Sequence, residues 1–252
     1  MTLPLPADLP PARDRGRRVP RWHAVLATAL LLLALAGFNV AVHLLPAGTV
    51  WLSLVAAPAL LAFGRLNGLS WAQLGLDRRR LRAGSFWGLG AIGVIGVVYL
   101  VGILLPTTRP AFLDARYHLA ENRALITAFL VIPIGTILLE EVAFRSVLWG
   151  MLHRHMRTTK VLLVSSVLFG LWHVFPALSD ARRGAVAGVH THAGAWTTLM
   201  VVAGTVAFTA IGGVVAGELR RRSGSVLASA GMHWATNGLG VLFGLVAWQL
   251  AR

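Results

Sequence analysis

Long apolar runs, separated by short polar segments, fill most of the chain. Each run comes close to the roughly 20 residues that an α-helix needs to cross a hydrocarbon core of about 30 Å. The pattern predicts transmembrane helices over residues 22–45, 49–66, 85–105, 124–152, 161–175, 194–219 and 225–250. We therefore expect an all-α fold, a polytopic membrane helix bundle of seven transmembrane helices. The number becomes eight if Gly238 and Gly240 break the last of them.

Residues 1–21 differ from the rest of the chain, because they are rich in proline and arginine and show no apolar periodicity. Such a composition predicts a disordered basic tail on the cytoplasmic side. The apolar run over residues 22–45 is longer than the core of a signal peptide, about 7 to 15 residues, and further runs follow it. We therefore interpret it as a membrane anchor and residues 22–252 as a single transmembrane domain.

The composition places the chain among membrane proteins, since 56% of its residues are hydrophobic and only 13% charged, against about 25% charged in soluble domains. The net charge is +14, and most basic residues lie between the apolar runs, in residues 13–21, 65–82, 154–160 and 220–222. Clusters of this kind mark the cytoplasmic side, so the N-terminus is expected there. The mixture of aromatic and basic residues typical of a nucleic-acid surface is missing, so we expect a lipid bilayer and no nucleic acid as partner.

Two residue types narrow the chemistry and the source. The chain has no cysteine, which excludes disulfides, thiol catalysis and thiolate metal sites. Arginine is used almost to the exclusion of lysine, with Lys160 the only lysine. This usage is typical of a GC-rich bacterial genome, and we expect a multi-pass protein of the bacterial plasma (inner) membrane.

Two adjacent carboxylates and an arginine lie inside the apolar run of residues 124–152. An ionisable side chain at hydrocarbon depth costs about 2.5 to 3.5 kcal/mol and is by default a candidate functional residue. Glu141 and Arg145 share a helix face and can pair, whereas Glu140 points about 100° away and has no partner on its own helix. An unpaired carboxylate suits a general base or acid. The alternative is that all three charges form one buried structural ion cluster.

Two later apolar runs carry further polar side chains at a similar depth. His173 lies in the fifth run, and His233 and Asn237 share one face of the last. At 1.5 Å per residue, Glu140 and both histidines lie roughly 12 to 20 Å from the cytoplasmic helix ends. A lone histidine on an apolar helix is more often a packing residue. Together, however, a base, two imidazoles and an amide are the groups needed to hydrolyse an acyl bond, and no GxSxG nucleophile turn is present.

The order and spacing of these residues resemble the CPBP family of intramembrane proteases, which includes the CAAX-prenyl endopeptidases and bacterial bacteriocin-processing or immunity proteins. The resemblance covers residues 124–250, the expected catalytic core. Each motif is short, and their joint order on successive apolar helices makes the match specific. The motifs are Glu140-Glu141-x-x-x-Arg145, Phe169-x-x-x-His173 and His233-x-x-x-Asn237.

The resemblance implies an intramembrane endopeptidase that cleaves a peptide bond near the cytoplasmic face. Within it, Glu140 and His173 would activate the attacking water. His233 and Asn237 would stabilise the tetrahedral oxyanion, as preorganised donors do in other acyl-transfer sites. The expected partner is a peptide or protein substrate, including a membrane-anchored C-terminal segment.

Two points are left open by the resemblance. Glu141 and Arg145 would either orient the catalytic pair or grip the backbone or C-terminus of the substrate. The family is also described as metalloproteases, and Glu140, His173 and His233 would then ligate Zn²⁺ as two histidines and one carboxylate. The preferred mechanism requires no cofactor, because a glutamate that activates water is not a spare ligand and no HExxH motif is present.

Two other functions remain as alternatives to the protease. Charged groups at the bilayer centre also mark ion paths, so a proton-coupled transporter is one of them. A transporter would be expected to show paired repeats with broken helices, and the sequence shows no convincing repeat. The other alternative is a catalytically silent immunity or binding protein that keeps the site for structural reasons.

Overall fold

The structure, a computed structural model, describes residues 20–44, 49–114, 117–183 and 194–251. These ranges are almost entirely helical and contain no strand, which confirms the predicted all-α membrane fold. The predicted disordered tail lies outside the described residues as far as residue 19. The division into a tail and one transmembrane domain therefore stays a prediction.

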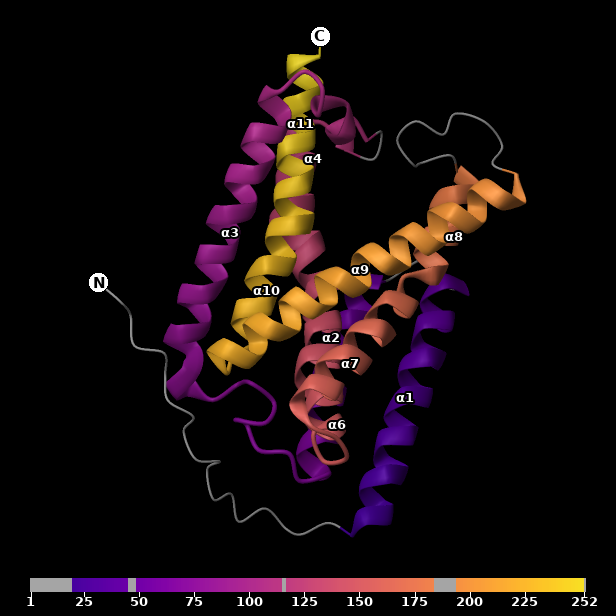
Figure 1. The fold of residues 1–252 in the computed structure, drawn as a ribbon, viewed down its shortest axis with the longest axis vertical. Coiled ribbons are helices and arrows are strands. Elements are labelled where there is room, and N and C mark those ends of the chain that lie inside the picture. Colours follow the sequence, from indigo (N-terminus) through magenta and orange to yellow (C-terminus); the bar gives the residue numbers. More distant parts are fainter. Residues whose placement is uncertain (1–19, 45–48, 115–116, 184–193, 252) are drawn as a thin grey trace.

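The helices follow one another with short connections (Figure 1). A long central helix, Glu121–Leu152, is interrupted by three π-helical stretches and carries the two glutamates. A second composite helix ends the chain and carries His233. The elements are α1 (Arg21–Leu44), α2 (Thr49–Leu66), α3 (Leu81–Leu104), α4 (Glu121–Ile126), α5 (Leu138–Glu140), α6 (Trp149–Leu152), α7 (Thr158–Trp172), α8 (Val174–Arg183), α9 (Ala195–Ser223), α10 (Val226–Trp234) and α11 (Gly240–Leu250), with short 3-10 turns at Arg78–Arg80 and Arg109–Phe112.

Among the described residues, five helices are long and apolar enough to cross a membrane, so the chain is a multi-pass membrane protein. They are Arg21–Val42, Arg78–Leu104, Glu121–Leu152, Thr158–Ala181 and Ala195–Ser223, and Trp51–Leu66 is a shorter apolar helix. The last helix does not break at its glycines, because a π-helical turn, Ala235–Leu239, joins α10 to α11. The total of seven or eight spans stays a prediction.

Two segments differ from the sequence-based expectation. The residues after 175 were expected to form a loop between two membrane helices, but residues as far as 183 belong to the helix α8. Ala177 and Ala181, one turn apart in this helix, are both buried. In the connection after α2, leucines and a tryptophan beside a basic segment predict an interfacial segment with its leucines among the lipid headgroups. In the structure, however, Leu69 and Leu74 are fully buried in the core while Trp71 remains exposed. In both segments, packing against neighbouring helices determines the structure, and this packing cannot be predicted from the pattern of one segment alone.

Small residues allow the helices around the centre to approach closely. A Cβ added to Gly231 of α10 would lie 2.7 Å from the Cα of Gly88 in α3. Gly213 of α9 faces α7, since a Cβ there would lie 3.1 Å from the Cα of Ser166. Contacts of this kind are how apolar helices associate where the hydrophobic effect between them is absent. They hold α3, α7, α9 and α10 around the central helix.

The central helix departs from α-helical geometry near the glutamates. Pro133 lacks the amide hydrogen of a normal helical bond, and the helix runs in π form over Pro133–Ile137 and again over Glu141–Leu148. Ser53 of α2 donates to the carbonyl oxygen of Gly135 at 2.7 Å, which satisfies a backbone group in the first of these stretches. π-Helical turns are rare and frequently occur at functional sites. The glutamates lie at the junction between the two stretches.

Candidate active site

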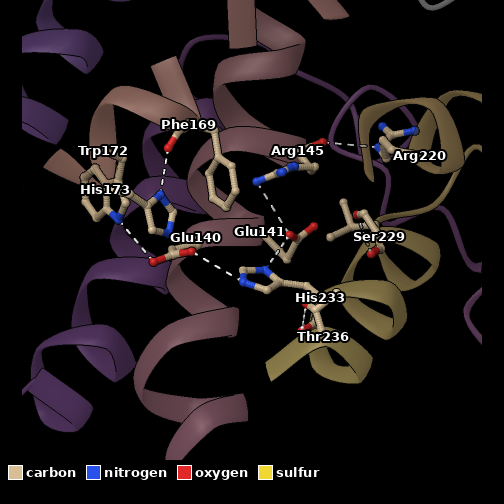
Figure 2. A network of polar contacts seen from close by, with 11 residues as sticks. Glu140, Glu141, Arg145, Phe169, Trp172, His173, Arg220, Ser229, His233 and Thr236 are labelled. Carbon is tan, nitrogen blue, oxygen red and sulfur yellow. Dashed lines mark hydrogen bonds and ion pairs between the residues drawn. The ribbon is translucent and has the colours of Figure 1, made fainter. Parts of the chain in front are cut away.

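Four ionisable side chains from the central helix and α10 form one buried cluster (Figure 2). The exposed fractions of Glu140, Glu141, Arg145 and His233 are 7%, 2%, 3% and 8%. Charges withdrawn from water to this degree are tolerated when they pair with one another. The cluster joins residues that the sequence places more than ninety positions apart, as the separation of Glu141 and His233 shows.

Glu141 is the centre of the cluster. Its Oε1 accepts a hydrogen bond from Nδ1 of His233 at 2.9 Å. The same oxygen lies 3.6 Å from a guanidinium nitrogen of Arg145, an ion pair at the predicted i,i+4 spacing. Arg145 also lies over the ring of Phe169, with 3.8 Å from its Cζ to the ring centroid, a cation–π contact. Glu141 therefore fixes the orientation of the His233 imidazole.

Glu140 is held on one side and open on the other. Its Oε1 accepts a hydrogen bond at 3.1 Å from the indole N–H of Trp172 in α7. Its Oε2 is buried without a hydrogen-bond partner and lies 3.6 Å from Nε2 of His233. This distance is longer than a direct hydrogen bond and within the range of an ion pair. The sequence-based expectation that Glu140 has no partner on its own helix agrees with these contacts, which both come from other helices.

His173 ends α7, and its backbone turns the chain into α8. Its Nδ1 lies 2.8 Å from the carbonyl oxygen of Phe169. A carbonyl can only accept, so Nδ1 carries the hydrogen and a neutral ring keeps its lone pair on Nε2. Figure 2 shows the ring of His173 pointing toward Glu140. An acceptor nitrogen therefore faces the same space as the open oxygen of Glu140.

An aromatic wall separates the two histidines. The ring of Phe169 meets the ring of His173 at a centroid distance of 4.8 Å and that of His233 at 5.8 Å, both edge to face. Phe169 is itself 5% exposed. Its ring thus fixes the spacing of the two imidazoles and excludes bulk water from one side of the cluster, which strengthens every electrostatic interaction inside it.

Like His173, Asn237 has no hydrogen bond to the charged cluster among the described residues. It lies half-buried in the π-helical turn Ala235–Leu239, just beyond His233 on the same helix. The structure thus brings Glu140, Glu141 and His233 together and places Asn237 nearby along the chain.

With both glutamates ionised, a protonated His233 balances the charges of the cluster. Glu140 and Glu141 then carry two negative charges, and Arg145 and His233 two positive ones. A buried group of charges is tolerated best when it is neutral overall and each member has a partner. In this form Nδ1 of His233 donates to Glu141, and Nε2–H is a second donor directed toward Glu140. The hydrogen positions are assigned from this network.

Sequence reasoning missed Trp172, which fixes one oxygen of Glu140. A signal for it exists, because an indole N–H in a membrane helix needs an acceptor and Trp172 directly precedes His173. Its ring is held between Phe38 of α1, stacked at 6.4 Å, and Phe144 of the central helix, edge-on at 5.4 Å. The indole N–H is therefore a fixed donor.

The residues proposed as zinc ligands were Glu140, His173 and His233. Within the described ranges, no three His, Cys, Asp or Glu side chains lie close enough together to hold a metal ion. One carboxylate oxygen of Glu140 is also taken by Trp172. The donor set therefore does not fit a bound metal ion in this geometry.

Comparison with known proteins bears on the same part of the chain. Residues 122–239 match the model of the family described as type II CAAX prenyl endopeptidase Rce1-like. Over this segment the chain is similar to that family. The match contains the central helix, both histidines and the turn with Asn237, and it confirms the resemblance to the CAAX proteases. No curated protein and no solved structure matches the chain significantly.

Proposed function

We propose that this protein is an intramembrane endopeptidase that hydrolyses a peptide bond with a water molecule activated by Glu140 and His173. The observation that carries the proposal is the open Oε2 of Glu140, a buried carboxylate oxygen without a hydrogen-bond partner, 3.6 Å from Nε2 of His233. A Rce1-like segment supports the protease class. The roles of the individual residues rest on the geometry alone.

In the first step a water molecule donates its hydrogens to Oε2 of Glu140 and to Nε2 of His173, which are both acceptors. Glu140 takes one proton as the water oxygen bonds to the carbonyl carbon of the substrate. The carbonyl π bond breaks, and its electrons form the tetrahedral oxyanion. Trp172 keeps the other oxygen of Glu140 in place during the transfer.

The oxyanion needs donors that are in place before the charge develops. Protonated His233 supplies Nε2–H, and its ring is fixed by the 2.9 Å bond from Nδ1 to Glu141. Asn237, which follows on the same helix, supplies a second donor when its side-chain amide turns toward the substrate. Arg145 acts on Glu141 and so on the orientation of His233.

In the second step the tetrahedral intermediate collapses. The bond from carbon to nitrogen breaks, and the leaving amine takes the proton held by Glu140. The products are a carboxylic acid, which keeps the second hydrogen of the water, and an amine, and Glu140 returns to its ionised form. After release, proton transfer from the acid to the amine gives a carboxylate and an ammonium group. No covalent intermediate with the protein is formed.

The substrate reaches the site from the membrane or from its surface. We propose a peptide or protein with a membrane-anchored C-terminal segment, cleaved near the cytoplasmic face. The basic segments between the helices support a cytoplasmic N-terminus in a bacterial inner membrane. The orientation of the protein in the membrane and the membrane anchor of the substrate are both parts of this proposal.

The test is cleavage of membrane-anchored peptides by the full-length protein in lipid nanodiscs. Peptides with and without a C-terminal lipid are incubated with the wild type, with Glu140→Gln and with Glu218→Gln. Glu218 is the matched control, because its carboxylate lies at the end of α9 and pairs with Arg221 and Arg222, away from the cluster. We expect cleavage by the wild type and by Glu218→Gln, and at least a hundredfold loss in Glu140→Gln.

Three results would contradict the proposal. Equal cleavage by Glu140→Gln and the wild type would remove the base from the mechanism. Solute flux through the wild type without any cleavage would favour the transporter. A wild type that binds peptides and leaves them intact would favour the catalytically silent protein.

A further inference from the structure

A second polar pocket lies away from the catalytic cluster, where α6 ends. It has a volume of about 210 Å³. Unlike the apolar clefts between the outer helices, it presents as much polar as apolar surface. It is formed by the connection after α2, the end of the central helix and α9, and its lining residues are Ala72, Gln73, Trp149, Gly150, His153 and Arg220.

Arg220 is the charged group of this pocket and is only 5% exposed. Its guanidinium donates to three backbone carbonyls, from Nε to Arg145 at 3.2 Å and from one terminal nitrogen to Gln73 at 3.1 Å and Ala72 at 3.5 Å. The loop is shaped around this side chain, because a Cβ at Gly75, which has a φ of +75°, would collide with the guanidinium. The guanidinium is thus fixed in one position.

The charge of Arg220 has no counterion. In the described part of the chain no carboxylate pairs with it, and all its contacts are to neutral carbonyl oxygens. Its second terminal nitrogen makes no hydrogen bond, yet it is not sealed inside the protein, so it borders the pocket. A buried guanidinium without an anion is costly. The other titratable group of the pocket, His153, is a second potential donor and adds no negative charge.

We propose that this pocket binds a phosphate group through the free guanidinium nitrogen of Arg220 and the imidazole of His153. A fixed guanidinium with open N–H groups is the side chain best suited to phosphate oxygens. The pocket lies at helix ends that carry basic residues, and basic segments next to membrane helices attract anionic lipid headgroups. The phosphate comes either from a lipid headgroup or from solution.

The site is physically connected to the catalytic cluster. Nε of Arg220 donates to the carbonyl oxygen of Arg145, whose own side chain pairs with Glu141. A phosphate that holds Arg220 therefore stabilises the π-helical segment on which the cluster is built. Binding is thus expected to raise the thermal stability of the whole protein.

The test is thermal unfolding of the full-length protein in an uncharged detergent, followed by tryptophan fluorescence. Inorganic phosphate, short-chain phosphatidylglycerol and acetate are compared at equal ionic strength. We expect the phosphate-bearing ligands to raise Tm by at least about 2 °C at saturation, and acetate to leave it unchanged. A rise with phosphatidylglycerol alone would identify a lipid headgroup, and a rise with both would show that free phosphate suffices.

Variants distinguish phosphate binding in the pocket from a nonspecific effect of anions on the stability of a basic protein. Arg220→Gln removes the charge but also three structural hydrogen bonds, so His153→Glu is the informative change. It places a carboxylate of the protein itself beside Arg220 and is expected to abolish the shift, whereas His153→Gln keeps at least half of it. Arg222→Gln, at an exposed arginine bound to Glu218, is the control and keeps the full shift.

Three results would overturn the proposal. The first is no rise in Tm with either phosphate-bearing ligand. The second is an equal rise with acetate, which would show a general anion effect. The third is a full rise in His153→Glu, which would place the binding elsewhere. None of these results bears on peptide cleavage, so the proposed protease function is tested separately.

Discussion

Trp172→Phe removes one hydrogen bond from the proposed catalytic base and leaves the packing around it largely in place. The indole N–H donates to Oε1 of Glu140 at 3.1 Å. A phenylalanine keeps the ring contacts with Phe38 and Phe144. A hydrogen bond to a charged group contributes about 1.5 to 3 kcal/mol. If it is used to hold the base, its loss lowers the rate by roughly tenfold to a hundredfold.

The assay is the steady-state cleavage of a membrane-anchored peptide in nanodiscs. We expect the loss to appear in kcat with little change in KM, because Trp172 fixes the base and is not placed to bind the substrate. The control is Trp248→Phe, which also removes an indole hydrogen bond, to the carbonyl oxygen of Asp114 at 3.2 Å. Equal rates for the two variants would refute the positioning role of Trp172.

Two further predictions concern stability, measured by unfolding in detergent. Glu141→Gln leaves Arg145 and His233 without their buried partner and should cost about 3 to 5 kcal/mol, whereas the exposed pair at Glu218 contributes at most about 1 kcal/mol. Gly231→Ala places a methyl group 2.7 Å from the Cα of Gly88 and should cost about 1 to 3 kcal/mol, while Gly90→Ala, with nothing within 4 Å, should be neutral. If Glu141→Gln were no less stable than Glu218→Gln, the role of the buried charges would be contradicted. If Gly231→Ala were no less stable than Gly90→Ala, the close approach of α10 and α3 would be contradicted.

The helices and their membrane character could be predicted from the sequence, because long apolar runs depend only on local composition. The pairing of Glu141 with Arg145 was also predictable, since i,i+4 neighbours meet on almost any helix. Glu140 and His233 lie in separate apolar runs, and the sequence predicts a similar depth for them. In the structure, Oε2 of Glu140 lies 3.6 Å from Nε2 of His233.

Contacts that depend on packing could not be predicted. Successive glutamates on an ideal helix point in different directions, yet both carboxylates face His233 at the start of a π-helical stretch. Arg220 was counted among the cytoplasmic arginines, but its side chain is buried against carbonyls of two distant segments. Helix periodicity in the sequence predicts neither the change from α- to π-helical form nor which distant segment packs against a given side chain.

An experimental density map of the cluster tests the central claim most directly. The account predicts one ordered water molecule within about 3.2 Å of both Oε2 of Glu140 and Nε2 of His173, the two acceptors of the proposed first step. A map with no water in reach of both atoms, or with the Glu140 side chain turned toward lipid, would contradict it.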